Sequence, residues 1–142
     1  MSKFDIIEVL KDKLAPLFQK SGVILAYVFG STVKGEIGPL SDIDIAVLFP
    51  EEEKMPMTKS CELNYYAAAE LLGDENEKVE IGPLNNQALS FCYEVISTGI
   101  CIYGREEDRV KYEVSILSQY LDFMYLARKY NQAFIENLLK EE

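Results

Sequence analysis

Apolar and polar residues alternate along this chain in patterns that predict both helices and strands. Residues 3–20 place apolar side chains at helical spacing, whereas residues 23–29 are continuously apolar and rich in strand-forming residues, as in a buried strand. The same criteria predict further strands at 43–49, 78–81 and 100–103 and further helices at 59–72, 86–97 and 105–139. We find no internal linker or repeat and therefore expect a single α+β domain over residues 1–142.

The longest predicted helix, residues 105–139, carries two apolar stripes, although a helix packed on one small sheet needs only one. One stripe has heptad-like 4-3-4-3 spacing and consists of Val110, Val114, Leu117, Leu121 and Met124. The other consists of Tyr112, Ile116, Tyr120, Phe123, Tyr130 and Phe134. Two interpretations remain open at this point. Either both stripes lie inside the core, or part of the helix contacts another protein chain, for which tyrosine is well suited.

The composition excludes several classes of function. The chain has 142 residues and no histidine, so neither a Ser-His-Asp nor a Cys-His nucleophile system nor a His-ligated zinc site is possible. The net charge is −10, and residues 51–100 carry ten acidic and three basic side chains. Such an acidic chain lacks the basic surface that direct nucleic-acid binding requires.

The chain also shows no signal for secretion or membrane insertion. Its first residues are amphipathic and charged, unlike a signal peptide, and the longest apolar run, residues 23–29, is too short to span a bilayer. Cys61, Cys92 and Cys101 form no closely spaced pair. An odd number of cysteines without a secretory segment indicates reduced thiols, so we expect a cytoplasmic protein.

One segment combines residues whose chemistry fits together. Gly30 and Ser31 directly follow the first predicted strand, and Asp42 and Asp44 open the second. The two-residue period of a strand predicts both carboxylates on one face, with Cβ atoms about 6–7 Å apart. That separation suits two carboxylates that converge on divalent ions about 3.5–4 Å apart, and magnesium prefers such oxygen ligands. Gly30 allows the backbone to approach a phosphate closely.

The loop between these two pairs contains further groups suited to phosphate. Ser31 offers a hydroxyl and an N–H group, Lys34 offers a positive charge, and Gly35 gives a second permissive backbone position. The loop is not a Walker A motif, because Glu36 and Ile37 stand where that motif requires Lys and Ser or Thr. Each part alone is common in loops and caps. Their combination at this spacing is rare by chance, on the order of one chain in several hundred, which favours a functional site.

Residues 29–47 resemble the signature of the DNA polymerase β-like nucleotidyltransferases, and in particular that of the minimal nucleotidyltransferases of the MntA type, the antitoxin partners of HEPN-domain toxins. Gly30, Ser31, Asp42 and Asp44 match the GS-x10-DxD pattern of that family without a gap. The resemblance continues more weakly through a short acidic strand, a Leu84-Asn85 step and a long C-terminal helix. It implies a small mixed sheet flanked by helices, with that long helix at the end of the chain.

The resemblance also implies roles for individual residues. Asp42 and Asp44 would hold magnesium, together with a third carboxylate from a neighbouring strand, where this chain has Glu80 and, as the fallback, Glu77. With two ions bound, Glu80 would either hold the second ion, which lowers the pKa of the acceptor hydroxyl, or act as general base. The residues expected to bind the ATP substrate are Gly30, Ser31, Lys34, Gly35 and Ser41.

The reaction implied is transfer of AMP from ATP to a hydroxyl with release of pyrophosphate. Family resemblance suggests a tyrosine of a cognate HEPN ribonuclease toxin as the acceptor, so that the protein is an antitoxin that acts by AMPylation. Two alternatives stay open. One is a binding module that neutralises the toxin by contact alone, and the other is an adenylyltransferase for a small cationic acceptor such as an aminoglycoside, which an acidic pocket would favour.

Overall fold

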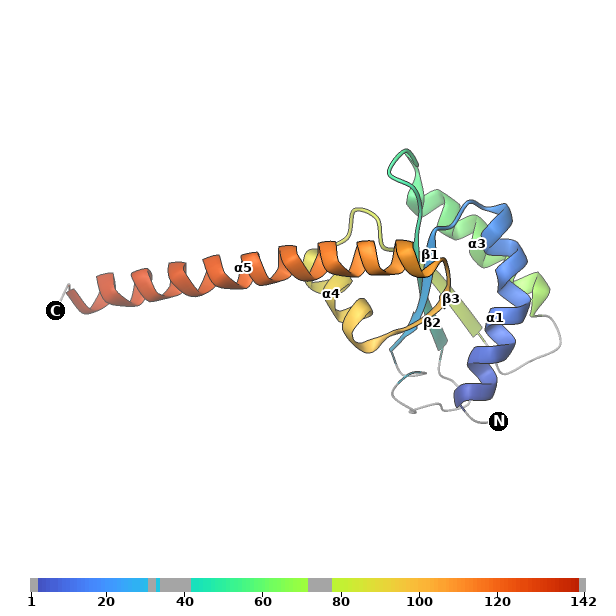
Figure 1. The fold of residues 1–142 in the computed structure, drawn as a ribbon, viewed down its shortest axis with the longest axis horizontal. Helices are drawn as coiled ribbons and strands as arrows, with labels where there is room; N and C mark the ends of the chain where they lie inside the picture. Colours follow the sequence, from blue (N-terminus) through green and yellow to red (C-terminus); the bar gives the residue numbers. More distant parts are fainter. Residues whose placement is uncertain (1–2, 31–32, 34–41, 72–77, 141–142) are drawn as a thin grey trace.

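A computed structural model describes residues 3–30, 33, 42–71 and 78–140 of the protein, and Figure 1 shows their arrangement. The elements follow the order α1 (Lys3–Lys20), β1 (Leu25–Phe29), β2 (Asp42–Leu48), α3 (Pro56–Glu70), β3 (Lys78–Pro83), α4 (Leu89–Thr98), β4 (Ile100–Tyr103) and α5 (Glu106–Lys140). None of the helices in this described part is long and apolar enough to cross a membrane.

The four strands form one mixed sheet in the order β3-β2-β1-β4. Strand β1 is antiparallel to β2 and to β4, whereas β2 and β3 are parallel. Helices α1 and α3 pack on one face of the sheet, and α4 with the first part of α5 packs on the other (Figure 1). The predicted α+β fold, a small mixed sheet flanked by helices with a long helix at its end, is confirmed.

The predicted elements differ from the observed ones mainly at their ends. Helix α3 begins at Pro56 instead of residue 59, because proline is well tolerated in the first turn of a helix. Strand β3 continues to Pro83, since Gly82 and Pro83 still pair with β2. Helix α4 begins at Leu89 instead of residue 86, because Asn86 has a φ of 62°, outside the helical region. Pro16 lies inside α1 without ending it.

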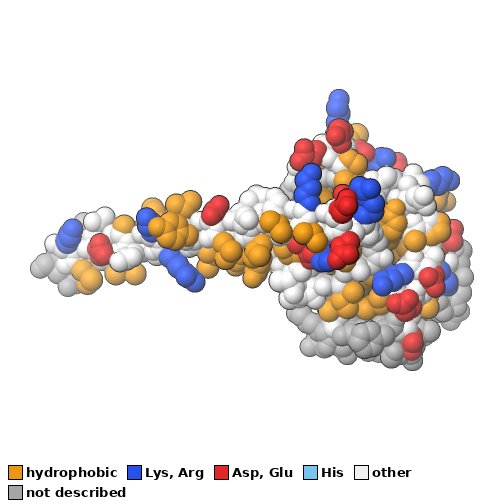
Figure 2. All heavy atoms as spheres, viewed as in Figure 1, with side chains coloured by type: hydrophobic (Ala, Val, Ile, Leu, Met, Phe, Trp, Pro, Cys, Tyr) orange, Lys and Arg blue, Asp and Glu red, His pale blue; other side chains and the backbone are white. Residues whose placement is uncertain are grey.

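Helix α5 has two different halves. Its first half packs against α4, where Ile116 is buried and the rings of Tyr93 and Tyr120 stack at 3.8 Å with an interplanar angle of 4°. Its second half projects away from the rest of the molecule (Figure 1), and apolar side chains gather along it (Figure 2). The exposed large apolar residues of this second half are Leu121, Phe123, Tyr125, Leu126, Tyr130, Phe134, Ile135, Leu138 and Leu139.

The two apolar stripes predicted for this helix therefore differ in how much of each is buried. Most of the heptad-spaced stripe is exposed to solvent. This holds even on the first half of α5, where Val110, Val114 and Leu117 are exposed. Only the beginning of the tyrosine-rich stripe packs on the body of the protein. The interpretation that both stripes lie inside the monomer core is thus wrong.

Candidate active site

Strands β2 and β3 bring two of the predicted acidic residues together. Asp44 and Glu80 are in register across the parallel pair, so their side chains project from the same face of the sheet. The next pair on this face, Ala46 and Gly82, is small and leaves space beside the carboxylates. All four residues line one cavity of about 160 Å³.

Aromatic side chains form another part of the lining of this cavity. Phe29 at the end of β1 and Phe91 on α4 line it together with Asp44 and Glu80, and their rings meet edge to face at 5.6 Å and 82°. Phe29 is paired with Asp44 in the antiparallel register of β1 and β2. The carboxylates therefore stand beside an apolar wall, with Asp44 partly buried and Glu80 exposed.

Gly30 allows the chain to turn directly against Asp44. Its φ is 79°, in the left-handed region that glycine adopts without strain. A Cβ atom at this position would lie 2.8 Å from Oδ2 of Asp44, closer than any real Cβ contact. A side chain at residue 30 would therefore fill the space beside this carboxylate oxygen, which explains in physical terms why the GS motif begins with glycine.

The remaining predicted site residues are only partly described. Asp42 opens β2 in register with Lys78, but its side chain lies outside the described part of the structure. Ser31, Lys34, Gly35 and Ser41 also lie outside it, as does the fallback residue Glu77. Among the side chains that are described, no group of three His, Cys, Asp or Glu residues gathers as a metal site. The structure thus brings together Gly30, Asp44 and Glu80.

These residues fit a magnesium ion. Asp44 and Glu80 supply hard carboxylate oxygens from neighbouring positions on two strands, and Mg²⁺ is commonly held by one or two carboxylates together with substrate phosphates and water. The missing side chain at Gly30 leaves room beside Asp44 for such oxygen ligands. The donor set contains no thiol or imidazole, which agrees with a hard cation.

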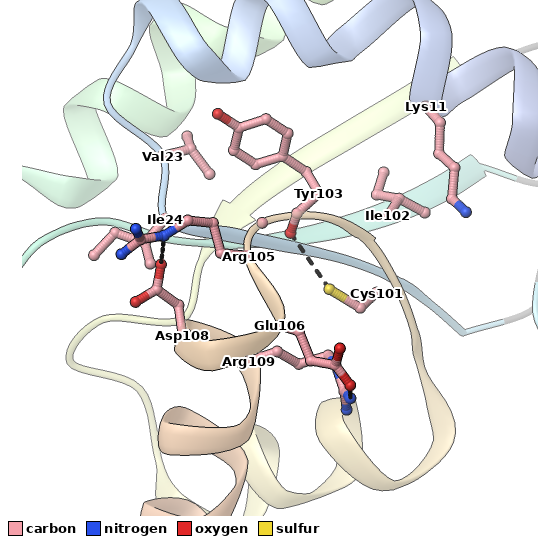
Figure 3. Close-up of a pocket in the computed structure, with 11 residues that line it drawn as sticks. Lys11, Val23, Ile24, Cys101, Ile102, Tyr103, Arg105, Glu106, Asp108 and Arg109 are labelled. Carbon is pink, nitrogen blue, oxygen red and sulfur yellow. Dashed lines mark hydrogen bonds and ion pairs between the residues drawn. The ribbon is translucent and has the colours of Figure 1, made fainter.

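A wider cavity of about 750 Å³ lies elsewhere, at the β4 side of the sheet (Figure 3). Its charged groups take part in ion pairs: Nε of Arg105 is 3.2 Å from Oδ2 of Asp108, Arg109 pairs with Glu106, and Lys11 pairs with Glu8 outside the cavity. Cys101 also lines it, but burial raises the pKa of this thiol and keeps it protonated. Since β4 and β3 form opposite edges of the sheet, this cavity is separate from the Asp44–Glu80 pair.

Two asparagines make contacts near these strands that the sequence patterns do not predict. Asn64 on α3 forms two hydrogen bonds with the main chain of Ile81, and Asn85 forms two with the main chain of Phe49. The Leu84-Asn85 step belongs to the family resemblance, but its contact with Phe49 depends on the fold. Asn64 contacts a residue 17 positions away, so no local pattern of α3 predicts this contact.

Comparison with known families identifies the class of this protein. The sequence profile of the family described as "Polymerase beta, Nucleotidyltransferase" matches residues 12–108, which is more than half of the chain. The chain therefore belongs to the polymerase β nucleotidyltransferase family. No curated protein sequence matches it significantly.

Solved structures share this fold over nearly the whole chain. A chain from the crystal structure of a toxin–antitoxin with AMP-PNP is 24% identical, with a TM-score of 0.67, and the match covers 91% of this chain and 98% of that one. A chain from the complex of tri-AMPylated Shewanella oneidensis HEPN toxin with MNT antitoxin is 23% identical, with a TM-score of 0.63 and coverage of 94% and 98%. A chain from an MntA-HepT toxin–antitoxin is 22% identical, with a TM-score of 0.63 and coverage of 93% and 98%.

Proposed function

We propose that this protein transfers AMP from ATP to a tyrosine hydroxyl of a cognate HEPN-domain toxin and acts as the antitoxin of that pair. The observation that carries the proposal is the in-register pair Asp44 and Glu80, with Gly30 against Asp44, in a domain of the nucleotidyltransferase family. Structural neighbours include a toxin–antitoxin with AMP-PNP and a complex with a tri-AMPylated HEPN toxin, which supports both the nucleotide and the acceptor.

Each residue has a distinct task in this proposal. Asp44 and Glu80, with Asp42 from the same motif, would hold magnesium, which neutralises charge on the triphosphate when bound. Gly30 admits phosphate oxygens beside Asp44. The acceptor oxygen attacks the α-phosphorus, the bond to the β-phosphate oxygen breaks, and pyrophosphate leaves with the electron pair. Glu80 is exposed at the edge of the site, so in place of a metal ligand it could instead serve as the base that takes the proton of the hydroxyl.

Nucleotide binding in this proposal also uses the loop after β1. Ser31, Lys34, Gly35 and Ser41 keep the role that the motif assigns to them, which is to hold the phosphates of ATP. Phosphoryl transfer depends mainly on positioning and on charge neutralisation, so such a loop suffices without a covalent intermediate. The absence of histidine from the sequence is compatible with this chemistry, because carboxylates provide both metal ligands and base.

The toxin would dock on the projecting half of α5. Leu126 is 63% exposed and Tyr130 is 72% exposed, so a large apolar surface of this helix contacts nothing within the described body. A continuous group of exposed apolar side chains is typical of a protein–protein contact site. An amphipathic helix that inserts between helices of a partner buries such a surface efficiently.

The same surface supports a second candidate function, in which the protein neutralises the toxin by contact alone. The two candidates differ in their need for the carboxylates. A contact antitoxin needs α5 and has no chemical need for Asp44 or Glu80, whereas an adenylyltransferase needs both regions.

One experiment separates the candidates. The protein is incubated with Mg²⁺, α-labelled ATP and the HEPN protein encoded beside it, and label retained on that protein is measured. We expect transfer by the wild type and none by the Asp42→Asn/Asp44→Asn double variant, with loss of neutralisation. A double variant that neutralises the toxin as well as the wild type does would show that contact alone is sufficient.

A further inference from the structure

Strand β3 is an edge strand, and one side chain occupies its outer edge beside the site. The main-chain N–H of Ile81 donates a hydrogen bond of 2.7 Å to Oδ1 of Asn64, and Nδ2 of Asn64 donates one of 2.9 Å to the carbonyl oxygen of Ile81. The amide of Asn64 thus pairs with this residue as a neighbouring strand would. Ile81 directly follows Glu80 in the chain.

The contact connects the site to the core of the protein. Asn64 lies on α3, which is anchored in the core by Leu63 and Ala67, both almost completely buried. Glu80 itself is exposed and has β2 on one side only. The two hydrogen bonds from Asn64 to Ile81 therefore hold the backbone of β3 at its outer edge. They restrict how far Glu80 can shift along the strand direction relative to Asp44.

We propose that Asn64 is a positioning residue for Glu80, and that its two hydrogen bonds to Ile81 keep the Glu80 carboxylate in register with Asp44 for metal binding and transfer. The inference rests on the proposed function, in which Glu80 is the third carboxylate. A displacement of about 1 Å at a reacting group can lower a rate by about 100-fold, so a clamp on the backbone matters for catalysis as well as for stability.

The chain contains a matched control for this clamp. Asn85 forms the same pair of bonds with Phe49, both of 2.9 Å, and like Asn64 it is half-buried. Phe49 lies past the opposite end of β2, five residues from Asp44, which corresponds to about 16 Å along a strand. Substitution of Asn85 removes the same chemistry far from the carboxylates.

The test compares Asn64→Ala with Asn85→Ala in the full chain. We expect both to lower Tm by a similar amount, roughly 4–8 °C. Only Asn64→Ala should lower kcat, by about 10- to 100-fold, with little change in KM for ATP. It should also weaken binding of Mn²⁺, measured with α,β-methylene ATP in place of ATP, and speed hydrogen exchange at the Ile81 amide. Equal kcat values for the two variants would overturn the proposal.

A double-variant cycle shows whether Asn64 acts through Glu80. In a Glu80→Gln background, Asn64→Ala should lower kcat no further, because the group that it positions is already lost. An equal loss in both backgrounds would assign Asn64 a purely structural role. If Asn64→Ala does not fold, Asn64→Asp replaces it, because Asp keeps an acceptor for the Ile81 N–H and loses the donor. Asn85→Asp is then the control, since it introduces the same negative charge.

The outcomes also separate this inference from the proposed function. A wild type that transfers AMP, with an Asn64→Ala variant of unchanged kcat and Mn²⁺ affinity, refutes the positioning role alone. A wild type that transfers no AMP refutes the proposed function, and the Mn²⁺ affinities of the Asn64→Ala and Asn85→Ala variants then decide the positioning role. Weaker binding in the first variant only would support it, and equal binding would refute it.

Discussion

The body of the protein and the projecting half of α5 differ in the solvent exposure of their apolar side chains. In the body, Leu10, Leu14 and Val28 are fully buried between sheet and helices. On the second half of α5, side chains of the same kind, such as Leu126 and Phe134, are more than half exposed. A single helix joins the two regions (Figure 1). Tyr120 still stacks on Tyr93 of α4, whereas the next residue, Leu121, is more than half exposed.

This difference separates two tasks in one small chain. The candidate catalytic carboxylates belong to strands whose other face is closed by the core, which gives them a rigid support. The exposed helix has no such support and offers surface instead. Partner binding should therefore tolerate substitutions at the carboxylates, and the stability of the body should tolerate substitutions on the exposed half of α5.

The largest expected effect concerns Asp44 in the body. Asp44→Asn keeps the shape of the side chain but removes its charge, so AMP transfer should fall by roughly 100-fold or more. Affinity for the HEPN partner, measured by calorimetry, should stay the same. Asp12→Asn, an exposed position on α1, is the control and should leave the rate unchanged. A loss of partner binding in Asp44→Asn would show that the two tasks are not separate.

The next effect concerns the projecting helix. Leu126→Asp places a charge on the exposed apolar surface, and we expect roughly tenfold to 100-fold weaker binding of the partner, because such anchors dominate interface energies. The Tm should not change, since Leu126 is already exposed. Asn131→Asp introduces the same charge five residues further along and should have little effect. Equal affinity of Leu126→Asp and the wild type would exclude this surface as the docking site.

A third comparison tests where the body ends along α5. Ile116→Ala should lower the free energy of unfolding by about 2 kcal/mol, because it leaves a cavity against α4. Leu121→Ala, five residues on, should change it by less than about 0.5 kcal/mol, because Leu121 is 57% exposed. Chemical denaturation measures both. Similar losses for the two variants would mean that the second half of α5 folds back on the body in solution.

The smallest expected effect is a difference in alkaline stability. Burial raises the pKa of Tyr27, whose hydroxyl has no hydrogen-bond partner within the described residues. The unfolded chain loses this proton from about pH 10, whereas the folded protein keeps it, so stability should fall as pH rises above that value, by about 1.4 kcal/mol per pH unit. Tyr27→Phe should remove this part of the slope.

The control for this effect lies on the projecting helix. Tyr130 is 72% exposed, so Tyr130→Phe should leave the dependence of stability on pH unchanged. Denaturation at pH 9, 10 and 11 measures the slopes of both variants. Equal slopes for Tyr27→Phe and the wild type would mean that the Tyr27 hydroxyl is accessible to solvent in the folded protein.

Local patterns were sufficient to predict much of the fold. The continuous apolar run that contains β1 predicted a strand covered on both faces, and the structure confirms it. The pattern of α5 predicted a helix with a surplus apolar stripe. It did not show which stripe faces the body, because both are apolar and the choice depends on Tyr93, a residue distant in sequence.

The candidate site was predictable where chemistry demands fixed residue types at fixed spacing. Gly30 and Asp44 belong to one motif, and the structure brings them together. The choice between Glu77 and Glu80 could not be made from sequence, because it depends on how β3 pairs with β2. The observed register places Glu80 opposite Asp44, whereas Glu77 lies outside the described residues. The role of Asn64 was hidden for the same reason, since it contacts a strand 17 residues away.

The stack of Tyr93 on Tyr120 has a mechanical consequence. It lies where α5 leaves the body, so its geometry sets the direction in which the remaining helix points. Residues 121–140 extend for about 30 Å beyond it, so a tilt of about 10° at the stack would move the tip by about 5 Å. If a partner docks on this part of the helix as proposed, the packing of the two rings at 3.8 Å would therefore influence its distance from the carboxylates.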